Sequence, residues 1–375
     1  MNIPDRVAEL AVRAQLPAYI YDLTGLGPHA AAIRACLPSN VGFYYAIKAN
    51  PDPEILRALV PHVDGFEVSS GGELRHVTNV APEMPVAFGG PGKTTAELAA
   101  AVSAGALVHV ESPRELTALA SEARSAGRKA DILLRLNPPP APLAGANVPS
   151  TPGPSGPQLV MGGVGSPFGM DLEEAGRCLG LIGADTRVLG VHAHVASGLD
   201  AGAALDVAER VAGLADDIGY GGLVNCGGGM GVDYREPGRL FDWGGYGAGL
   251  GKLGRPLRIE PGRAVTAYCG WYVTRVLDVK TSYGETFAIV AGGTHHLRTP
   301  AAKGHDQPCV ILGDPRPGTV TYTGQLCTPK DVLARNVAGR PRVGDIVAFG
   351  MAGAYAWNIS HQRFLMHPEP SFGYV

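Results

Sequence analysis

One lysine in the segment FYYAIKANP, residues 43–51, follows an apolar run and precedes an Asn-Pro pair that ends regular structure. This position predicts that Lys48 lies at the end of a buried strand. A lysine placed there is either the first solvated residue after the strand or an amine that forms a Schiff base with a carbonyl compound. The other residues at strand ends decide between these two interpretations.

A glycine-rich segment, NCGGGMG at 225–231, and the segment EPGR at 260–263 also follow predicted strands. Glycines leave backbone N–H groups free to surround an anion, because no Cβ blocks the approach. The guanidinium of Arg263 adds a group suited to bidentate contact with phosphate. A dinucleotide-binding fingerprint would instead open a helix early in the chain, with an acidic residue about 20 positions later. The two segments together predict a phosphate-binding cup.

The elements that must position these residues alternate between short β-rich runs and stretches with helical spacing. Strands are predicted at 41–48, 64–69, 85–89, 107–111, 130–137, 188–195, 222–227 and 256–260, and helices at 52–60, 71–79, 94–103, 113–126, 171–182, 201–218 and 239–251. This alternation is typical of a (β/α)8 barrel, with a doubly wound open sheet as the alternative. In a barrel, the loops that follow the strands share one end, so we expect Lys48 and the phosphate cup to meet there.

The pattern changes after residue 262, where strands follow one another without long helices. We therefore predict a β domain of antiparallel strands formed by 1–22 and 262–375, in which the strand-like segment 17–24 takes part, beside a barrel domain over 23–261. The segment 137–158 is rich in Pro, Gly, Ser and Ala and is predicted to be a flexible loop or lid.

Composition excludes several classes of function. The chain has 375 residues, 45% of them hydrophobic, and a formal net charge of -3, so it lacks the basic excess that nucleic-acid binding requires. No apolar stretch reaches about 18 residues and no targeting segment is recognisable, which predicts a cytoplasmic enzyme that spans no membrane. Six cysteines without a C-x-x-C spacing predict neither a metal site nor a disulfide framework.

The motifs YYAIKANP, GFEVSSGGEL, HVESPREL, LRLNP, HVASG, GGGMG, EPGR, GQLCTP and GAYAWN occur in this order. With them the chain resembles the fold-type III pyridoxal-phosphate enzymes over essentially its whole length, specifically the branch of diaminopimelate and ornithine decarboxylases. The resemblance implies a (β/α)8 barrel with a C-terminal antiparallel β domain and pyridoxal 5'-phosphate as cofactor. It also implies a head-to-tail homodimer with shared active sites.

The resemblance further implies a role for each matching residue. Lys48 would carry the cofactor as a Schiff base, and His194 would stack on the cofactor ring. The phosphate would be held by Ser197, Gly227, Gly228, Gly229, Arg263 and Tyr355. Glu260 would face the ring nitrogen and keep it protonated, which favours decarboxylation, whereas racemases of this fold place an arginine there. Cys327 from the other subunit would reprotonate the product, because a thiol with an ordinary pKa of about 8.5 is mostly protonated at neutral pH.

The chain departs from its best-known relatives directly after Cys327. Diaminopimelate decarboxylases continue with Glu and ornithine decarboxylases with Asp, and each acid serves the distal ammonium of the substrate, whereas this chain has Thr328 and, later, Asp331 as a substitute. The segment 292–307 is instead basic, with His295, His296, Arg298, Lys303 and His305. This pattern resembles decarboxylases of siderophore and natural-product pathways that act on citryl-diaminopropionate or on carrier-bound aminoacyl groups.

We therefore predict that a bulky or anionic conjugate loses its α-carboxylate here. The predicted substrate contacts are His296, Arg298, Thr328 and Asp331. The alternatives are a decarboxylase of a free diamino acid such as diaminopimelate, an amino-acid racemase, and a non-catalytic regulatory homologue. Homologues of the last kind lose cofactor groups, and the motifs above lack none of them.

Overall fold

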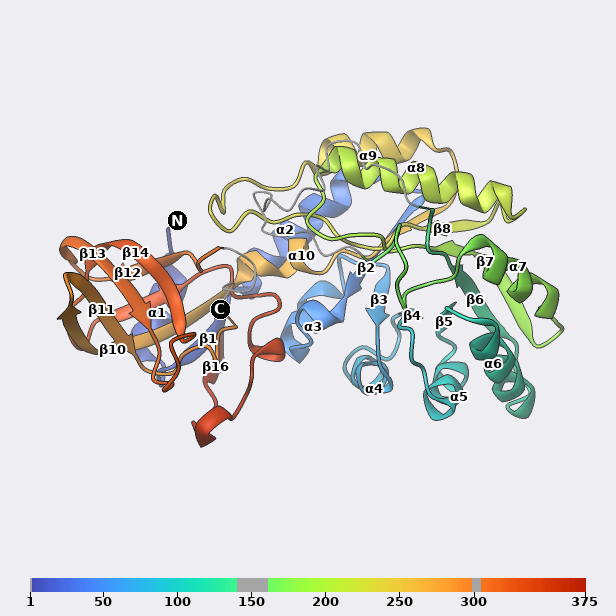
Figure 1. The fold of residues 1–375 in the computed structure, drawn as a ribbon. Helices are drawn as coiled ribbons and strands as arrows, with labels where there is room; N and C mark the ends of the chain where they lie inside the picture. The colour runs from blue at the N-terminus through green and yellow to red at the C-terminus, as the bar shows by residue number, and fades with distance from the viewer. Residues whose placement is uncertain (1, 140–160, 299–304) are drawn as a thin grey trace.

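The computed structural model describes residues 2–139, 161–298 and 305–375, and places them in a barrel and a separate β sheet (Figure 1). The barrel is closed by eight parallel strands in the order β2-β3-β4-β5-β6-β7-β8-β9. The register Val41↔Leu257 joins the last strand to the first. The predicted (β/α)8 barrel is therefore confirmed, and the open-sheet alternative is excluded because an open sheet has no such closing pair.

Every predicted barrel strand is present, although most are shorter than predicted. They are β2 (Val41–Ala46), β3 (Gly65–Val68), β4 (Val86–Phe88), β5 (Leu107–Val110), β6 (Ala130–Arg135), β7 (Thr186–His192), β8 (Leu223–Asn225) and β9 (Leu257–Ile259). The residues that follow the strands leave the ladder early and turn toward one end of the barrel. The short strands therefore position the loops that hold the candidate site residues.

The predicted helices surround the barrel and begin at side chains that cap them. They are α3 (Pro53–Leu59), α4 (Gly71–Val80), α5 (Thr95–Ala104), α6 (Pro113–Ser125), α7 (Leu172–Leu181), α8 (Ala201–Asp217) and α9 (Trp243–Lys252). Ser70 and Ser112 accept the backbone N–H three residues later, and Thr94 forms a reciprocal capping box with Glu97. Such caps satisfy N–H groups that a helix leaves unpaired at its start.

Two helices near the N-terminus were not predicted. Helix α1 (Asp5–Arg13) precedes strand β1 (Ala18–Tyr21), and helix α2 (Leu23–Cys36) follows it directly. The predicted strand 17–24 was therefore too long, because Asp22 caps α2 by accepting the N–H of Gly25. Helix α2 contains Pro28 and two glycines, residues that disfavour helix, and its packing against α3 and α9 outweighs that local preference.

The second part is an eight-stranded sheet in the order β12-β15-β10-β11-β13-β14, in which β1 also pairs with β10 and β16 pairs with β1. Its strands are β10 (Gly270–Ser282), β11 (Glu285–Val290), β12 (Cys309–Leu312), β13 (Arg316–Thr323), β14 (Val332–Arg340), β15 (Ile346–Phe349) and β16 (Ser371–Tyr374). Most pairs are antiparallel as predicted, but β11 pairs with β13 and β1 with β16 in parallel. The domain boundaries at 22/23 and 261/262 stay a prediction.

The N-terminal strand β1 lies in this sheet because it pairs antiparallel with β10, with Ala18 opposite Val273. A small core formed by Val7, Ala11, Ile20, Trp271, Val273, Ile346 and Ala348 packs α1 against the sheet. Within the described ranges, no helix has the length and apolar character needed to cross a membrane. Most of the predicted loop 137–158 lies outside the described residues.

Candidate active site

Lys48 lies one short turn beyond strand β2, in the 3-10 turn Ile47–Ala49. Its Nζ is 2.5 Å from Oε2 of Glu67 and 3.4 Å from Oγ of Ser69. The Lys48 side chain is 41% exposed, whereas that of Glu67 is 5% exposed, so the amine faces the open mouth of the barrel and the carboxylate lies beneath it. The first interpretation of Lys48, a merely solvated residue, does not fit this pairing.

The pKa of Lys48 reflects two opposing influences. Burial disfavours the ammonium, but the nearby Glu67 carboxylate more than compensates and raises the pKa of Lys48 above its ordinary value. The amine is therefore charged and must lose a proton before it can attack a carbonyl group. Glu67 is placed to accept that proton. The signal for Glu67 in the sequence is a carboxylate inside the otherwise apolar strand β3, Gly65–Val68.

The glycine-rich turn after β8 is packed so closely that only glycine fits. A Cβ on Gly228 would lie 2.4 Å from the carbonyl oxygen of Glu260, and a Cβ on Gly229 would lie 2.1 Å from that of Ala196. Gly229 also has a φ of 102°, which side chains rarely adopt. These contacts bring the turn against EPGR and the HVASG segment, as the barrel predicts.

His194 is held against this turn through its ring. The backbone N–H of Gly228 donates to Nδ1 of His194 over 3.1 Å, so the neutral ring carries its proton on Nε2. Burial and the positive charges of Lys48 and Arg135 lower the pKa of His194 to about 3. Ser197 lies in the same segment, and the next residue, Gly198, donates its N–H to the carbonyl of Gly229 over 2.8 Å.

Arg263 opens the short helix α10 (Arg263–Thr266) and lies between two tyrosines. Its Nη1 donates to the hydroxyl of Tyr234 over 3.0 Å, and its guanidinium carbon lies 4.5 Å from the centre of the Tyr355 ring. Tyr355 comes from the C-terminal part of the chain, and its N–H donates to the carbonyl of Ala49 over 2.7 Å. The side chain of Asn358 likewise donates to the carbonyl of Lys48. The segment 355–358 therefore closes over the turn that carries the lysine.

Glu260 follows β9 and is only 6% exposed. Its Oε1 accepts a hydrogen bond from the amide of Asn225 over 2.6 Å, and its Oε2 lies 3.4 Å from Nε2 of His192. The rings of His192 and His109 stack with 4.1 Å between their centres. Burial lowers the pKa of both histidines well below the ordinary value. The carboxyl group of Glu260 is thus buried beside a pair of neutral imidazoles.

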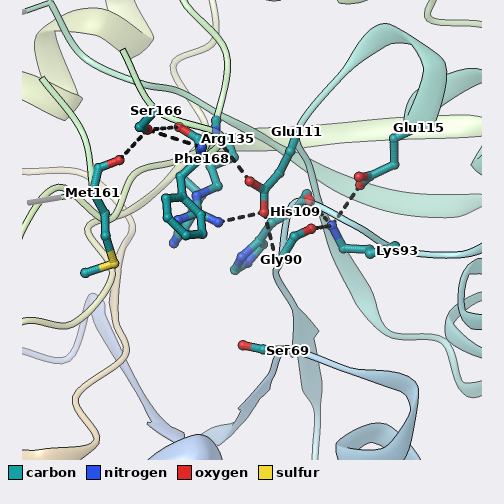
Figure 2. Close-up of polar contacts among 12 residues, drawn as sticks. Ser69, Gly90, Lys93, His109, Glu111, Glu115, Arg135, Met161, Ser166 and Phe168 are labelled. Atoms are coloured by element: carbon teal, nitrogen blue, oxygen red, sulfur yellow. Dashed lines mark hydrogen bonds and ion pairs between the residues drawn. The ribbon is translucent and has the colours of Figure 1, made fainter. Parts of the chain in front are cut away.

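A buried network of charged groups supports the neighbouring loops (Figure 2). Nη1 of Arg135 donates to Oε1 of Glu111 over 2.6 Å, and that carboxylate also accepts the N–H groups of Gly90 and Gly169. The ring of Phe168 lies over the guanidinium of Arg135, 5.1 Å from its carbon to the ring centre. The pair thus ties the loops after β4 and β5 to the segment that ends near Met170.

Lys93 forms the second part of the network in Figure 2. Its Nζ donates to Oε1 of Glu115 over 2.8 Å and to the carbonyls of Gly90 and His109. The side chains of Lys93 and Glu115 are 2% and 6% exposed. This lysine is fully engaged and cannot take the place of Lys48.

Replacing Glu115 with alanine is expected to lower the free energy of unfolding by roughly 3–5 kcal/mol, because it leaves the buried Lys93 without its anion. The loss is measured by urea unfolding. The control is Glu174→Ala, which removes a surface partner of Arg177 and should cost less than about 1 kcal/mol. Equal losses in the two variants would contradict the role given to the buried pair.

The predicted substrate residues are not equivalent in the structure. His296 is buried, with Nδ1 3.1 Å from the Tyr272 hydroxyl and Nε2 2.8 Å from the carbonyl of Pro368. Asp331 is 2% exposed and accepts the backbone N–H groups of Thr294 and Leu326, each over 2.7 Å. Both side chains therefore hold loops of the β sheet in place, and we leave them out of the proposed substrate contacts.

The other predicted residues are open to solvent to different degrees. Arg298 is exposed between β11 and β12. In the loop between β13 and β14, Cys327 is exposed and Thr328 is half-buried. His305 is buried and its ring stacks on Tyr234, with 4.2 Å between centres. Lys303 lies outside the described residues.

Comparison with known proteins decides which family has this site. Residues 26–267 match the family described as "Pyridoxal-dependent decarboxylase, pyridoxal binding domain". The chain belongs to this family. It is a pyridoxal-phosphate-dependent amino-acid decarboxylase, as its motifs predicted.

Three curated relatives illustrate the range of the family. The decarboxylase is 37% identical to "2-[(L-alanin-3-ylcarbamoyl)methyl]-2-hydroxybutanedioate decarboxylase" of Staphylococcus aureus, over 95% of this chain and 93% of the relative. It is 30% identical to "L-glutamyl-[BtrI acyl-carrier protein] decarboxylase" of Niallia circulans, over 99% and 91% of the two chains. It is also 30% identical to the diaminopimelate decarboxylase of Deinococcus radiodurans, over 97% and 91%.

A solved structure has the same fold. Diaminopimelate decarboxylase from Helicobacter pylori, complexed with L-lysine, superposes with a TM-score of 0.85 at 23% identity, and covers 98% of this chain and 93% of its own. The barrel and the separate sheet are thus those of the fold-type III enzymes.

The residues of the decarboxylase fit pyridoxal phosphate. Gly228 and Gly229 form a turn in which no side chain fits, because a Cβ would collide with the carbonyl oxygens of Glu260 and Ala196. Arg263 stacks on Tyr355, whose backbone N–H binds the carbonyl of Ala49 next to Lys48. Glu260 contributes a buried carboxyl group, a group type suited to hold a protonated ring nitrogen. When bound, the cofactor supplies an electron sink for the pair released from a bond to Cα.

Proposed function

We propose that the decarboxylase removes the α-carboxylate of an amino-acid unit whose distal end carries carboxylates, in siderophore or other natural-product biosynthesis. The observation that supports this proposal is that the Asp331 carboxylate is already hydrogen-bonded within the protein. This carboxylate is buried and accepts two backbone N–H groups, so it does not serve a distal ammonium. The position directly after Cys327 holds the uncharged Thr328, and Arg298, in the basic segment 292–307, is exposed.

The relatives support the same substrate class. The name of the Staphylococcus aureus enzyme describes an alanine unit joined to a hydroxybutanedioate, which is a dicarboxylate. The name of the Niallia circulans enzyme describes a glutamyl group on an acyl-carrier protein. Both substrates are bulky, and neither name describes a free diamino acid. We favour a citrate-type conjugate because the first name describes a dicarboxylate, and an arginine such as Arg298 would select carboxylates by charge.

The residues at the mouth have distinct proposed roles toward the cofactor. Lys48 binds its aldehyde carbon, and the neutral His194 covers one face of its ring. The phosphate is held by Ser197, by the N–H groups of Gly227, Gly228 and Gly229, and by Arg263 and Tyr355. Stacking of Tyr355 on Arg263 limits the orientations of the guanidinium. Glu260 holds a proton at the ring nitrogen, which keeps that nitrogen positively charged.

Two proton transfers are assigned to side chains of the protein. Glu67 accepts the proton that Lys48 must lose, because its Oε2 is the nearest carboxylate oxygen to Nζ. Cys327 returns a proton to Cα after carbon dioxide has left. Cys327 is exposed on the β13–β14 loop, so we propose that it serves the active site of a second subunit in a homodimer.

The test of substrate class compares a citrate-conjugated amino acid with meso-diaminopimelate and ornithine. The conjugate is expected to be turned over efficiently and the free diamino acids poorly. In Arg298→Ala, KM for the conjugate should rise by about tenfold or more with little change in kcat, because a charge-assisted contact present in both ground state and transition state is lost.

The matched control is Arg316→Ala, which removes another exposed arginine of the same sheet and should leave both constants unchanged. Efficient turnover of meso-diaminopimelate or ornithine, together with indifference to Arg298→Ala, would favour the free diamino acid as substrate. If the conjugate is turned over efficiently and neither variant changes its KM, Arg298 does not bind the substrate, whereas the proposed substrate class stands.

A further inference from the structure

The interior of this barrel is polar at the level of the active site. Barrels of this kind are usually filled by aliphatic side chains. Here His109 on β5 lies 3.4 Å from Asn225 at the end of β8, measured from Nε2 to Nδ2. Strands β5 and β8 are not neighbours, so their side chains meet across the interior. Buried polar groups that replace a packed core indicate a functional requirement.

Asn225 is fully buried and every polar atom of its amide has a partner. Its Oδ1 accepts the backbone N–H of Gly227 over 3.0 Å. Its Nδ2 donates to Oε1 of Glu260 over 2.6 Å, and the second hydrogen of the same nitrogen points toward Nε2 of His109. The orientation of the amide is therefore unambiguous, because in the reversed orientation its oxygen would face a carboxylate oxygen of Glu260, and neither atom can donate a hydrogen bond.

The two shorter hydrogen bonds of Asn225 bind two parts of the proposed cofactor site, Gly227 and Glu260. Gly227 begins the turn that forms the phosphate cup, and Glu260 is the carboxylate beneath the ring. One rigid amide thus sets the distance between the cup and the carboxylate.

We propose that Asn225 is a positioning residue that holds Glu260 and the Gly227 turn in register for pyridoxal phosphate. The inference rests on the proposed role of Glu260 at the ring nitrogen. Asn225 does not touch the reacting atoms and acts through Glu260 and Gly227. Sequence pattern alone does not single out Asn225, because an Asn before a glycine-rich turn is a common loop residue.

The test measures the dissociation constant of pyridoxal phosphate from the apo-enzyme, by absorbance and by quenching of protein fluorescence, at several pH values. Asn225→Ala removes both contacts and should weaken binding by about tenfold or more, because two buried hydrogen bonds are lost. Its ratio to the wild-type constant should not vary with pH. Cys226→Ala, a change at the next residue along the strand end, is the control and should bind like the wild type.

Asn225→Asp gives the sharper result. An aspartate here would stand about 2.6 Å from Glu260, and two carboxyl groups at this distance share one proton, which raises the pKa of the pair. Below that pKa the protonated Asp donates to Glu260 as the amide does, and above it two anions repel each other. Binding should therefore approach the wild-type constant near about pH 5.5 and weaken progressively toward about pH 8.5.

Other ionisable groups face this pair, namely Tyr44 from β2, Lys48 from the turn after it, His109 from β5, His192 from β7, Cys226 after β8 and Arg258 from β9. They are the same in wild type and variant, so the ratio of the two dissociation constants isolates the effect of residue 225. Circular dichroism and the Tm of each apo-enzyme show whether a variant is folded. If Asn225→Ala does not fold, the nearly isosteric Asn225→Asp still provides the test.

Glu260→Gln separates the inference from the proposed function on which it rests. We expect this variant to shift the visible absorption band of the bound cofactor and to weaken binding. If Glu260→Gln has these effects while both Asn225 variants bind within about twofold of the wild type at all pH values, the inference about Asn225 is wrong and the role of Glu260 stands. If Glu260→Gln changes neither spectrum nor affinity, the proposed role of Glu260 itself fails. Equal, pH-independent weakening in Asn225→Asp and Asn225→Ala would overturn the assignment of a donor to Glu260.

Discussion

Replacing Lys48 with alanine is expected to abolish turnover and the visible absorption band of covalently bound pyridoxal phosphate. Lys48 is the lysine at the mouth of the barrel beside the phosphate cup, and its Nζ lies 2.5 Å from the carboxylate that can take its proton. Lys93, the nearby alternative, is buried and bound to Glu115 and two carbonyls. Loss of the residue that binds the cofactor covalently should lower kcat by several orders of magnitude.

The measurement combines absorbance spectra with borohydride reduction and mass analysis of the labelled peptide. In the wild type, the label should lie on the peptide that contains Lys48. The control is Lys252→Ala, which changes an exposed lysine at the end of α9 and should leave spectrum and label unchanged. A reduced label on another lysine of Lys48→Ala, with retained activity, would contradict the assignment.

Mixing two inactive variants, Lys48→Ala and Cys327→Ala, is expected to restore activity to about a quarter of the wild-type level. Half of the dimers in an equal random mixture are hybrids, and one of the two sites in each hybrid has both native residues if Cys327 serves the other subunit. The prediction follows from the exposed position of Cys327 on the β13–β14 loop. It is measured by activity after subunit exchange, with the hybrid quantified by native mass spectrometry.

The double variant Lys48→Ala, Cys327→Ala mixed with wild type supplies the converse control. Shared sites predict that only wild-type dimers are active, which again leaves about a quarter of the sites, whereas unshared sites predict about half. No recovery in the first mixture, with half of the sites active in the second, would show that Cys327 serves its own subunit. If the protein stays monomeric in both mixtures, the proposed homodimer is wrong.

The sequence was sufficient for the parts of this protein that depend on local pattern. Strand and helix positions around the barrel followed from the alternation of apolar runs, because each βα unit buries one strand and one helix face in the same way. Lys48, Gly228 and Glu260 were found because parallel strands must deliver their ends to one mouth. Helix α2 was missed because its glycines and Pro28 mask a helix that tertiary packing stabilises.

The tertiary structure decided which polar side chains can contact a substrate or cofactor and which are already hydrogen-bonded to other parts of the protein. Asp331 and His296 have the right chemistry for substrate contacts, yet backbone groups from distant loops occupy them. Glu67 and Asn225 looked ordinary in the sequence, and they became central only when the closed barrel brought them to Lys48 and Glu260. The physical reason is that strand periodicity specifies which way a side chain points, whereas a hydrogen-bond partner remote in sequence is specified only by the packed fold. The type of reaction was therefore readable from the chain alone, and the arrangement that supports it was decided by the closure of the barrel.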